Sequence, residues 1–565
     1  MRLKGGFAAD PRLGGLDCGL VVAGVAARTG RGALGAARAG DDAPDARATW
    51  LAIGVSALAI VVFLALELRH LDAVPRVYED EPWQASVAYR LLHDGVFGSQ
   101  LFAGLANMDQ RYYGFMPLHP LLLALDFRLL GVGLAQARLE PVLLSAVTLV
   151  LTAALGARLF GAWVGALAVV LLVFGRWTGL TYIQLTGIPL VDLARIARYD
   201  PLVPVLGLAA LHAWLSARDS GGRVWYMAAG ALASLAGLAH LYGLFWIPAL
   251  LVLSWLEGRR ARLAWLVAGM VVPWLPYLGY VLSDLPAWRA QTAIYAERFD
   301  LLDPRWYLSN VLNEYHRYGP GLGPPGPTML SRVGFWTLAI ALPIALTGLA
   351  WRAIHHHDAS ARALVVPALL LPTLFALLIY LKLVNYTLVE LPLFALAIAW
   401  LATRLWRQPG RPALVRPALA ALLVALVAEG GVALASLERT ATVTTPYPSF
   451  IARVRQAIPP GARIVALHTY WFGLEDHDLR SFLVPITWAD PLSQLPPVPL
   501  GAGLDRIAPD VVLLDPRLHD YFATDGARDG AQFQRWLERH HARLIDQIDD
   551  PTYGRMDVYQ VGSSS

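Results

Sequence analysis

Three carboxylates in a row, Glu79, Asp80 and Glu81, stand in the segment "VYEDEPWQ" (77–84), shortly after about twenty mostly apolar residues. A carboxylate can accept a proton from a reacting hydroxyl, and ionisable side chains near a membrane are costly enough to be candidate site residues. A simpler interpretation is that Glu81 and Pro82 begin a helix whose positive end attracts acids. That interpretation explains one carboxylate better than it explains three in succession.

Other ionisable and aromatic side chains recur at the ends of apolar runs further along the chain. Cationic groups could stabilise negative charge beside the acids. The candidates are Arg198, Asp200, His240, Lys382 and Tyr386. Simpler interpretations remain open: Asp200 before Pro201 suits a helix N-cap, His240 suits a packing residue, and Lys382 suits a cation that extends from a helix end to water. The run "HHHD" (355–358) has no matching ligands nearby, which favours a solvated turn over a metal site.

The composition predicts a polytopic membrane protein. Of the 565 residues, 56% are hydrophobic and only 16% are charged, and the mean hydropathy is +0.48. The net charge of +4 is small for this length and favours no nucleic-acid partner. Because Cys18 is the single cysteine, an intramolecular disulfide and a Cys-based zinc site are excluded. The Ala, Gly and Arg bias is typical of a GC-rich bacterial genome.

Eleven apolar segments are long enough to be candidate transmembrane helices. Residues 1–47 are expected to be a disordered cytoplasmic tail. The segment "PLHPLLLALDFRLL" (117–130) is expected at the interface, or as a re-entrant segment, because it is short and contains two prolines, Asp126 and Arg128. With this choice the arginine clusters face the cytoplasm, as the positive-inside rule requires. The candidate spans are 48–68, 136–158, 162–180, 200–217, 224–240, 241–256, 262–282, 333–353, 361–381, 386–405 and 414–437.

The C-terminal part has the pattern of a small α/β domain. Residues 48–440 would form the membrane domain and 445–562 an extracytoplasmic domain. "PYPSFIARVRQAIPPGARIVAL" predicts a helix, a turn and a strand, and "APDVVLLDP" (508–516) predicts a second, buried strand. "AQFQRWLERHHARLI" predicts an amphipathic helix, and "GRMDVYQV" predicts a last strand. No phosphate-binding glycine loop is present in this part of the sequence.

The membrane part resembles the GT-C superfamily of membrane glycosyltransferases, and within it the protein O-mannosyltransferases and the lipid A aminoarabinose transferases. The acidic run is followed by "ASVAYRLLHDG", "GFMPLHPLLLALDFRLLG" and "AQARLEPVLLSAVTLVLTAALGARLFG". An Arg-x-Asp motif follows at Arg198 and Asp200, and a late Tyr-plus-Pro element follows at Tyr386 and Pro392. The resemblance covers roughly 48–405 and implies a GT-C fold of about eleven transmembrane helices, with interfacial helices in the first outer loop.

The resemblance also implies an activity and roles for the candidates. A sugar would be transferred with inversion from a polyprenyl-phosphate donor to a lipid, glycan or protein acceptor at the outer face. Asp80 would be the base, and Glu81 would orient the acceptor or a metal ion. Arg198, Lys382, His240 and Tyr386 would stabilise the departing lipid phosphate. Asp200 would pair with Arg198, or join Asp80 around Mg²⁺ or Mn²⁺, a cofactor that the resemblance leaves open.

The main alternative is a membrane transporter or lipid flippase, which would also have many spans and ionisable groups at membrane depth. Transporters often contain internal repeats and helices interrupted near the midplane. This sequence has no evident repeat, and its ionisable groups gather at one face. The glycosyltransferase interpretation is therefore favoured, with membrane lipids and the lipid-linked sugar as the expected partners.

Overall fold

The computed structural model describes residues 46–562 except 181–184, 259, 297, 319–328, 411, 491–496 and 525. Nearly all of the expected tail 1–47, including Cys18, lies outside these residues. Up to residue 443 the helices are α2 (Ala46–Glu67), α3 (Asp80–Asp94), α4 (Leu118–Leu130), α5 (Leu134–Phe160), α6 (Ala162–Phe174), α7 (Pro189–Ala194), α8 (Leu202–Ser220), α9 (Arg223–Ala239), α10 (Trp246–Leu256), α11 (Leu263–Val271), α12 (Trp274–Leu282), α13 (Leu285–Ala296), α14 (Pro304–Leu312), α15 (Met329–His355), α16 (Ala359–Leu378), α17 (Leu391–Arg407) and α18 (Val415–Val443). Short 3-10 helices are η1 (Gln100–Phe102), η2 (Leu241–Phe245), η3 (Arg260–Arg262), η4 (Glu314–Tyr318) and η5 (Val384–Val389).

Each of the eleven predicted apolar segments contains a helix. Within the described part of the chain, five helices are long and apolar enough to cross a membrane, and a sixth span results if α11 and α12, bent by 47°, count as one. The chain is therefore a polytopic helical membrane protein. The eleven-span topology stays a prediction, because α6, α9, α10 and α17 are each shorter than the roughly 20 residues that a membrane crossing needs.

Small residues allow the helices to approach closely. Gly230 on α9 and Gly269 on α11 face each other's backbones: a Cβ added at Gly230 would lie 2.1 Å from the Leu266 carbonyl oxygen, and one at Gly269 would lie 2.1 Å from that of Met227. Larger side chains would push the two helices apart. Close packing of this kind is one source of attraction between helices in lipid, where the hydrophobic effect between them is absent.

The C-terminal part forms a mixed five-stranded sheet in the order β2-β1-β3-β5-β4. Strand β1 pairs in parallel with β2 and β3, and β5 pairs antiparallel with β3 and β4. The strands are β1 (Arg463–Ala466), β2 (Asp478–Ser481), β3 (Val511–Leu514), β4 (Arg543–Asp550) and β5 (Gly554–Gln560). The surrounding helices are α19 (Tyr447–Gln456), η6 (His468–Tyr470), α20 (Leu483–Ala489), α21 (Leu500–Ile507), α22 (Pro516–Ala523) and α23 (Ala527–Arg539).

One helix predicted from the sequence in this region is wrong at its C-terminal end. The predicted helix "AQFQRWLERHHARLI" stops at Arg539, and its last residues, from Arg543, begin β4. Strand β4 lies at the edge of the sheet and is mostly exposed, so its charged sequence "RLIDQIDD" lacks the apolar alternation by which strands are recognised. Charged residues are a common protection of edge strands against unwanted pairing.

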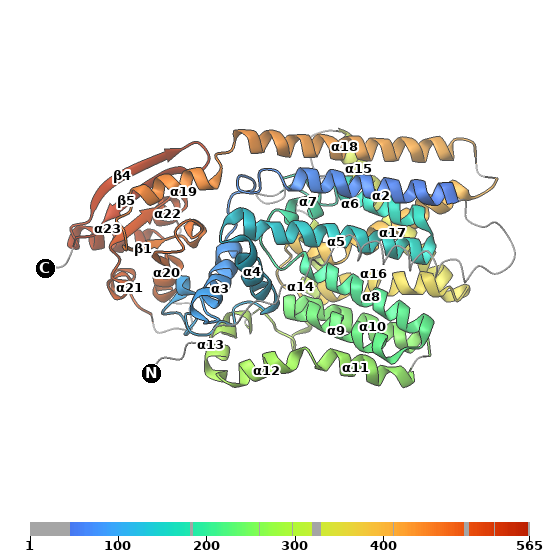
Figure 1. Ribbon diagram of the computed structural model, residues 1–565, viewed down its shortest axis with the longest axis horizontal. Coiled ribbons are helices and arrows are strands. Elements are labelled where there is room, and N and C mark those ends of the chain that lie inside the picture. The colour runs from blue at the N-terminus through green and yellow to red at the C-terminus, as the bar shows by residue number, and fades with distance from the viewer. Residues whose placement is uncertain are drawn as a thin grey trace, which may run out of the picture.

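The sheet lies at one end of the helix bundle, beside α3 and α4 (Figure 1). A single apolar core joins Ala85 of α3 and Phe127 of α4 to Phe450 of α19 and Leu513 of β3. The 13-residue α4, predicted to lie at the interface, is therefore part of the contact with the C-terminal sheet. This contact holds the start of α3, where the three carboxylates stand, between the bundle and the sheet.

Candidate functional site

Arg198 contacts two of the predicted site carboxylates at once. Its Nη1 donates to Oδ2 of Asp80, and its Nε donates to Oδ2 of Asp200 at 2.6 Å. The third nitrogen, Nη2, donates to the hydroxyl of Tyr199 at 2.9 Å. The guanidinium and Asp200 are buried, whereas 20% of the Asp80 side chain is exposed. The structure thus brings together three predicted residues, one of which reaches the surface.

Glu81 points away from this group, although it is adjacent to Asp80 in the sequence. Its carboxylate is fully buried and accepts hydrogen bonds from Nε and Nη2 of Arg138 on α5, at 2.7 and 2.8 Å. It also accepts from the backbone N–H groups of Tyr78 and Ala197. Because both oxygens are engaged, the geometry does not agree with the expectation that Glu81 orients an acceptor or a metal ion. The side chain instead fixes the start of α3 to α5 and to the loop that carries Arg198.

Aromatic rings form a wall beside the acids, and two predicted residues lie in it. The His240 ring stacks on Tyr199 with centroids 4.4 Å apart and lies 4.1 Å from the Tyr242 ring. Tyr386 follows at 4.9 Å from Tyr242 and 5.9 Å from His240. The Tyr242 hydroxyl donates to Oδ1 of Asp200 at 2.7 Å, so the wall is hydrogen-bonded to the Arg198 group.

Lys382 belongs to a second polar cluster. Its Nζ lies 2.8 Å from Oε2 of Glu314 and donates to two carbonyls of α16. Arg317 pairs with Glu314 and with the buried Glu390, and donates to the Tyr386 carbonyl at 3.4 Å. Glu314 and Arg317 therefore connect Lys382 to the Tyr386 carbonyl, and none of the described side-chain contacts joins Lys382 to Arg198.

The segment around Arg298 adds residues to the surroundings of Asp80 that are not among the site residues predicted above. The Arg298 guanidinium lies over the Tyr295 ring, 4.9 Å from its centroid, and interacts electrostatically with Tyr386. Tyr295 in turn interacts electrostatically with Asp80. Among the described residues, Arg298 has no carboxylate in ion-pair distance. In the sequence, Arg298 is one of several charged residues in the loop 283–332, which is a weak signal because loop charges are commonly solvated.

The C-terminal sheet contributes directly to the surroundings of Asp80. Arg517 on α22 lies 4.0 Å from the carboxylate of Glu79, the residue before Asp80. The buried His468 of η6 forms a hydrogen bond with the Glu79 backbone and contacts the Trp83 ring at 6.1 Å. Glu79, whose position the sequence left unexplained, thus connects the catalytic candidate to the C-terminal sheet.

Burial raises the pKa of Asp80 above the usual range of an aspartate. Arg198 acts in the opposite direction, and Asp200 and Glu79 raise the pKa further. A carboxylate with a raised pKa is a stronger base than an ordinary aspartate, and Arg198 keeps it oriented. This combination suits the abstraction of a proton from a hydroxyl group.

The residues around Asp80 and Asp200 do not fit a divalent cation. The Arg198 guanidinium lies between the two carboxylates, where a bridging cation would have to bind. In the part of the chain that the structure describes, no group of three or more His, Cys, Asp or Glu side chains is arranged to hold a metal ion. The exposed His355, His356 and His357 form no such group either.

This chain is similar to known proteins in its fold, whereas comparisons of its sequence find no match. No protein-family model and no curated protein matches this chain. ArnT from Cupriavidus metallidurans bound to undecaprenyl phosphate is similar in structure, with a TM-score of 0.56 and 17% identity over 90% of this chain and 98% of that chain. The apo oligosaccharyltransferase from Archaeoglobus fulgidus has a TM-score of 0.56 and 10% identity, over 91% of this chain and 75% of that chain.

Two further structures of the archaeal enzyme are informative about ligands of that protein. AglB in complex with an inhibitory peptide and a dolichol-phosphate has a TM-score of 0.54 and 11% identity, over 91% of this chain and 74% of that chain. The complex of the oligosaccharyltransferase with Zn and sulfate has a TM-score of 0.51, 11% identity, and covers 88% of this chain and 72% of that chain. The chain therefore shares the fold of these solved structures. This confirms the GT-C-like helical fold with a small C-terminal sheet that the sequence predicts, whereas the number of spans stays a prediction.

Proposed function

We propose that this protein is an inverting membrane glycosyltransferase. It would move a sugar from a polyprenyl-phosphate donor to a hydroxyl group of a lipid, glycan or protein acceptor at the extracytoplasmic face. The shared fold supports this class of donor, because the similar ArnT structure holds undecaprenyl phosphate and the AglB structure holds a dolichol-phosphate.

The observation that carries the proposal is the position of Asp80. Of the three site acids Asp80, Glu81 and Asp200, Glu81 and Asp200 are buried with their oxygens engaged, whereas Asp80 is partly exposed and held by one guanidinium. Asp80 is therefore the carboxylate that an acceptor hydroxyl can reach. Arg198 orients Asp80, which assigns it a different role from the phosphate binding that the sequence predicts, because its charge is already matched by two carboxylates.

In the proposed step, the acceptor oxygen attacks the anomeric carbon from the face opposite the phosphate. Asp80 takes the hydroxyl proton as the new carbon–oxygen bond forms. The bond from the anomeric carbon to the phosphate oxygen breaks, and the polyprenyl phosphate leaves with the electron pair. No redox partner or nucleotide is required, since the phospho-sugar bond supplies the free energy.

Arg298 and Tyr386 are proposed to stabilise the leaving phosphate. Arg298 interacts with Tyr386, and its charge has no carboxylate partner among the residues that the structure describes, so it remains available for an anion. His240 and Tyr242 border the same wall and would exclude water from the reacting centre. Lys382 would act indirectly, through Glu314 and Arg317, by fixing the segment that carries Tyr386.

The test uses purified full-length protein in detergent, labelled polyprenyl-phosphate sugars isolated from wild-type membranes, and acceptors extracted from a deletion strain. Wild-type protein should move label from the polyprenyl fraction to the acceptor, and Asp80→Asn should not. Asp94→Asn, at the exposed far end of α3, is the matched control and should keep wild-type transfer. A flippase would produce no transfer in detergent, so absence of labelled product with wild-type protein would refute the proposal.

A further inference from the structure

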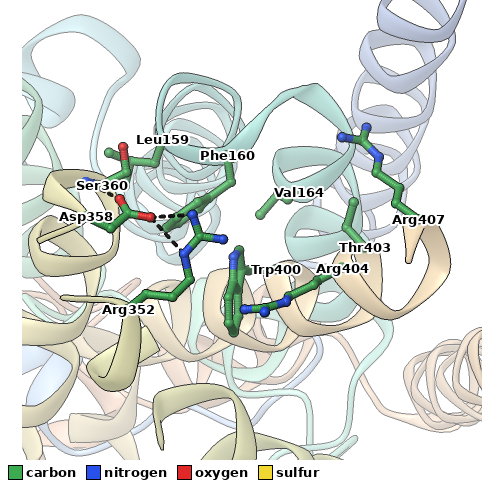
Figure 2. Close-up of a pocket in the computed structure, with 10 residues that line it drawn as sticks. All are labelled: Leu159, Phe160, Val164, Arg352, Asp358, Ser360, Trp400, Thr403, Arg404 and Arg407. Carbon is green, nitrogen blue, oxygen red and sulfur yellow. Dashed lines mark hydrogen bonds and ion pairs between the residues drawn. The ribbon is translucent and has the colours of Figure 1, made fainter. Parts of the chain in front are cut away.

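A cavity of about 390 Å³ lies at the end of the bundle remote from Asp80. Four parts of the bundle meet there: the junction of α5 and α6, the end of α15, the start of α16, and the end of α17 (Figure 2). Apolar side chains from α5 and α6, including Phe160 and Val164, line one part of the cavity. Polar side chains line the rest, and the arginines among them are Arg352, Arg404 and Arg407.

The length of α5 places this cavity on the other side of the membrane from the proposed active site. Arg138, which binds Glu81, lies near the beginning of this helix, and Phe160 of the cavity is its last residue. With 27 residues, α5 is about 40 Å long. That length exceeds the roughly 30 Å of a bilayer's hydrocarbon core, so the two ends of α5 reach opposite head-group layers.

The charges in the cavity do not balance. Arg352 pairs with Asp358 at 2.7 Å, and Asp358 also caps α16 by accepting from the backbone N–H groups of Ser360 and Ala361. Arg404 and Arg407 have no carboxylate partner among the residues that the structure describes. Figure 2 shows the guanidinium groups of Arg352 and Arg404 on either side of the Trp400 indole, and Arg404 lies 5.4 Å from its ring centroid. The cavity therefore carries an excess of two positive charges.

The surroundings indicate that the cavity opens at the level of the lipid head groups. Trp351 and Trp406, next to two of the lining arginines in sequence, are 58% and 46% exposed. Exposed tryptophans at a helix end are typical of the membrane–water interface. Basic pockets between membrane helices at this level bind anionic lipid head groups.

We propose that this cavity binds the phosphodiester head group of an anionic phospholipid in the leaflet opposite the active site. Arg404 and Arg407 contact the phosphate, and the apolar wall formed by Phe160 and Val164 receives the beginning of the acyl chains. The same phosphate chemistry is offered by soluble phosphates, but the apolar wall and the exposed tryptophans favour a lipid. Because α17 joins this cavity to the segment of Tyr386 and Glu390, the bound lipid would stabilise the bundle from its other end.

The test measures lipid binding by full-length protein that has been delipidated in detergent. Fluorescent phosphatidylglycerol is titrated against it, and phosphatidylcholine is the uncharged comparison. Wild-type protein should bind phosphatidylglycerol at least about tenfold more tightly than phosphatidylcholine. Arg404→Gln/Arg407→Gln should lose this preference, and Arg404→Lys/Arg407→Lys, which keeps both charges, should retain most of it. Sugar transfer in detergent serves as the folding control and should stay unchanged.

Arg416→Gln is the matched variant, because Arg416 lies at the same end of the bundle, outside the cavity, and donates to the Trp406 carbonyl. It should bind phosphatidylglycerol like wild type. Equal binding of the two lipids by wild-type protein, or an equal loss in Arg416→Gln, would overturn the proposal. Displacement of the lipid by inorganic phosphate or glycerol phosphate at equal concentration would overturn the assignment to a lipid and identify a soluble phosphate as the ligand.

Discussion

Arg517, on a helix of the C-terminal sheet region, lies 4.0 Å from the carboxylate of Glu79, the residue that precedes the proposed base Asp80. Both side chains are largely exposed, so the pair contributes little to stability. Its significance is electrostatic, because the charge of Glu79 raises the pKa of Asp80 and Arg517 offsets that charge. This contact predicts that the C-terminal region influences the acid–base properties of the site as well as its packing.

Changing this pair should shift the pH dependence of transfer. Asp80 accepts a proton only when ionised, so transfer falls as the pH drops through its pKa. Arg517→Gln leaves the charge of Glu79 without its partner, raises the pKa of Asp80 and moves the acid limb to higher pH. Glu79→Gln moves that limb to lower pH. An exposed ion pair contributes about 0.2–1 kcal/mol of interaction energy, so each variant should shift the acid limb by roughly 0.1–0.7 pH unit.

Profiles of kcat/KM against pH would measure these shifts. Arg480→Gln is the control, because Arg480 pairs with Asp478 inside the C-terminal sheet and should leave the profile unchanged. Shifts of the same sign in Arg517→Gln and Glu79→Gln would contradict the electrostatic explanation.

Asp80→Asn should lower kcat by about 10²–10⁴-fold, the contribution typical of a general base. The amide keeps the size of the side chain and can accept from Arg198, so the protein should fold and insert normally. Single-turnover transfer with the donor pre-bound would measure the chemical step. Residual activity above about a tenth of wild type would show that another group accepts the proton.

Arg198→Lys should reduce transfer far more than Tyr242→Phe. A lysine is a single point of charge and cannot bind Asp80 and Asp200 together as the guanidinium does. Tyr242→Phe removes one hydrogen bond to the Asp200 carboxylate, worth about 1.5–3 kcal/mol for a charged acceptor, so its cost should not exceed about 150-fold. Rates measured on the two variants at saturating donor would compare them, and equal losses would argue against a role for the Arg198 contacts.

Glu81→Gln should destabilise the protein by about 3–5 kcal/mol, because it leaves Arg138 as an uncompensated buried charge. Thermal unfolding in detergent, followed by tryptophan fluorescence, would report the loss. Asp219→Asn, which breaks the exposed pair with Arg158, should cost at most about 1 kcal/mol. Similar unfolding temperatures for the two variants would contradict the structural role of Glu81.

The predicted topology can be tested by cysteine labelling after Cys18 is replaced by serine. Thr524→Cys, at an exposed position beyond β3, should react with an impermeant reagent added to intact cells. His356→Cys, exposed in the turn between α15 and α16, should react only after permeabilisation. The reverse pattern would place the C-terminal region in the cytoplasm and exclude the outer face as the side of the reaction.

The amino-acid sequence by itself determined the membrane class, the positions of the helical segments and the set of candidate acids and bases. Long apolar runs can satisfy their backbone hydrogen bonds in lipid only as helices, so these features follow from local composition. The sequence did not predict strand β4, because an edge strand needs little apolar surface. The charged residues before it also resemble the polar face of an amphipathic helix, so the predicted helix was extended past Arg543.

Only the tertiary structure decided which acid faces the reaction. Asp80 and Glu81 are neighbours of the same chemical type, but successive residues of a helix point about 100° apart. Arg138 therefore receives Glu81 and Arg198 receives Asp80. Likewise, Lys382 forms an ion pair with Glu314, whereas Arg298 has no carboxylate partner in the described part of the chain. Each of these ion-pair partners comes from a segment that is distant in the sequence. A local sequence pattern therefore cannot predict it.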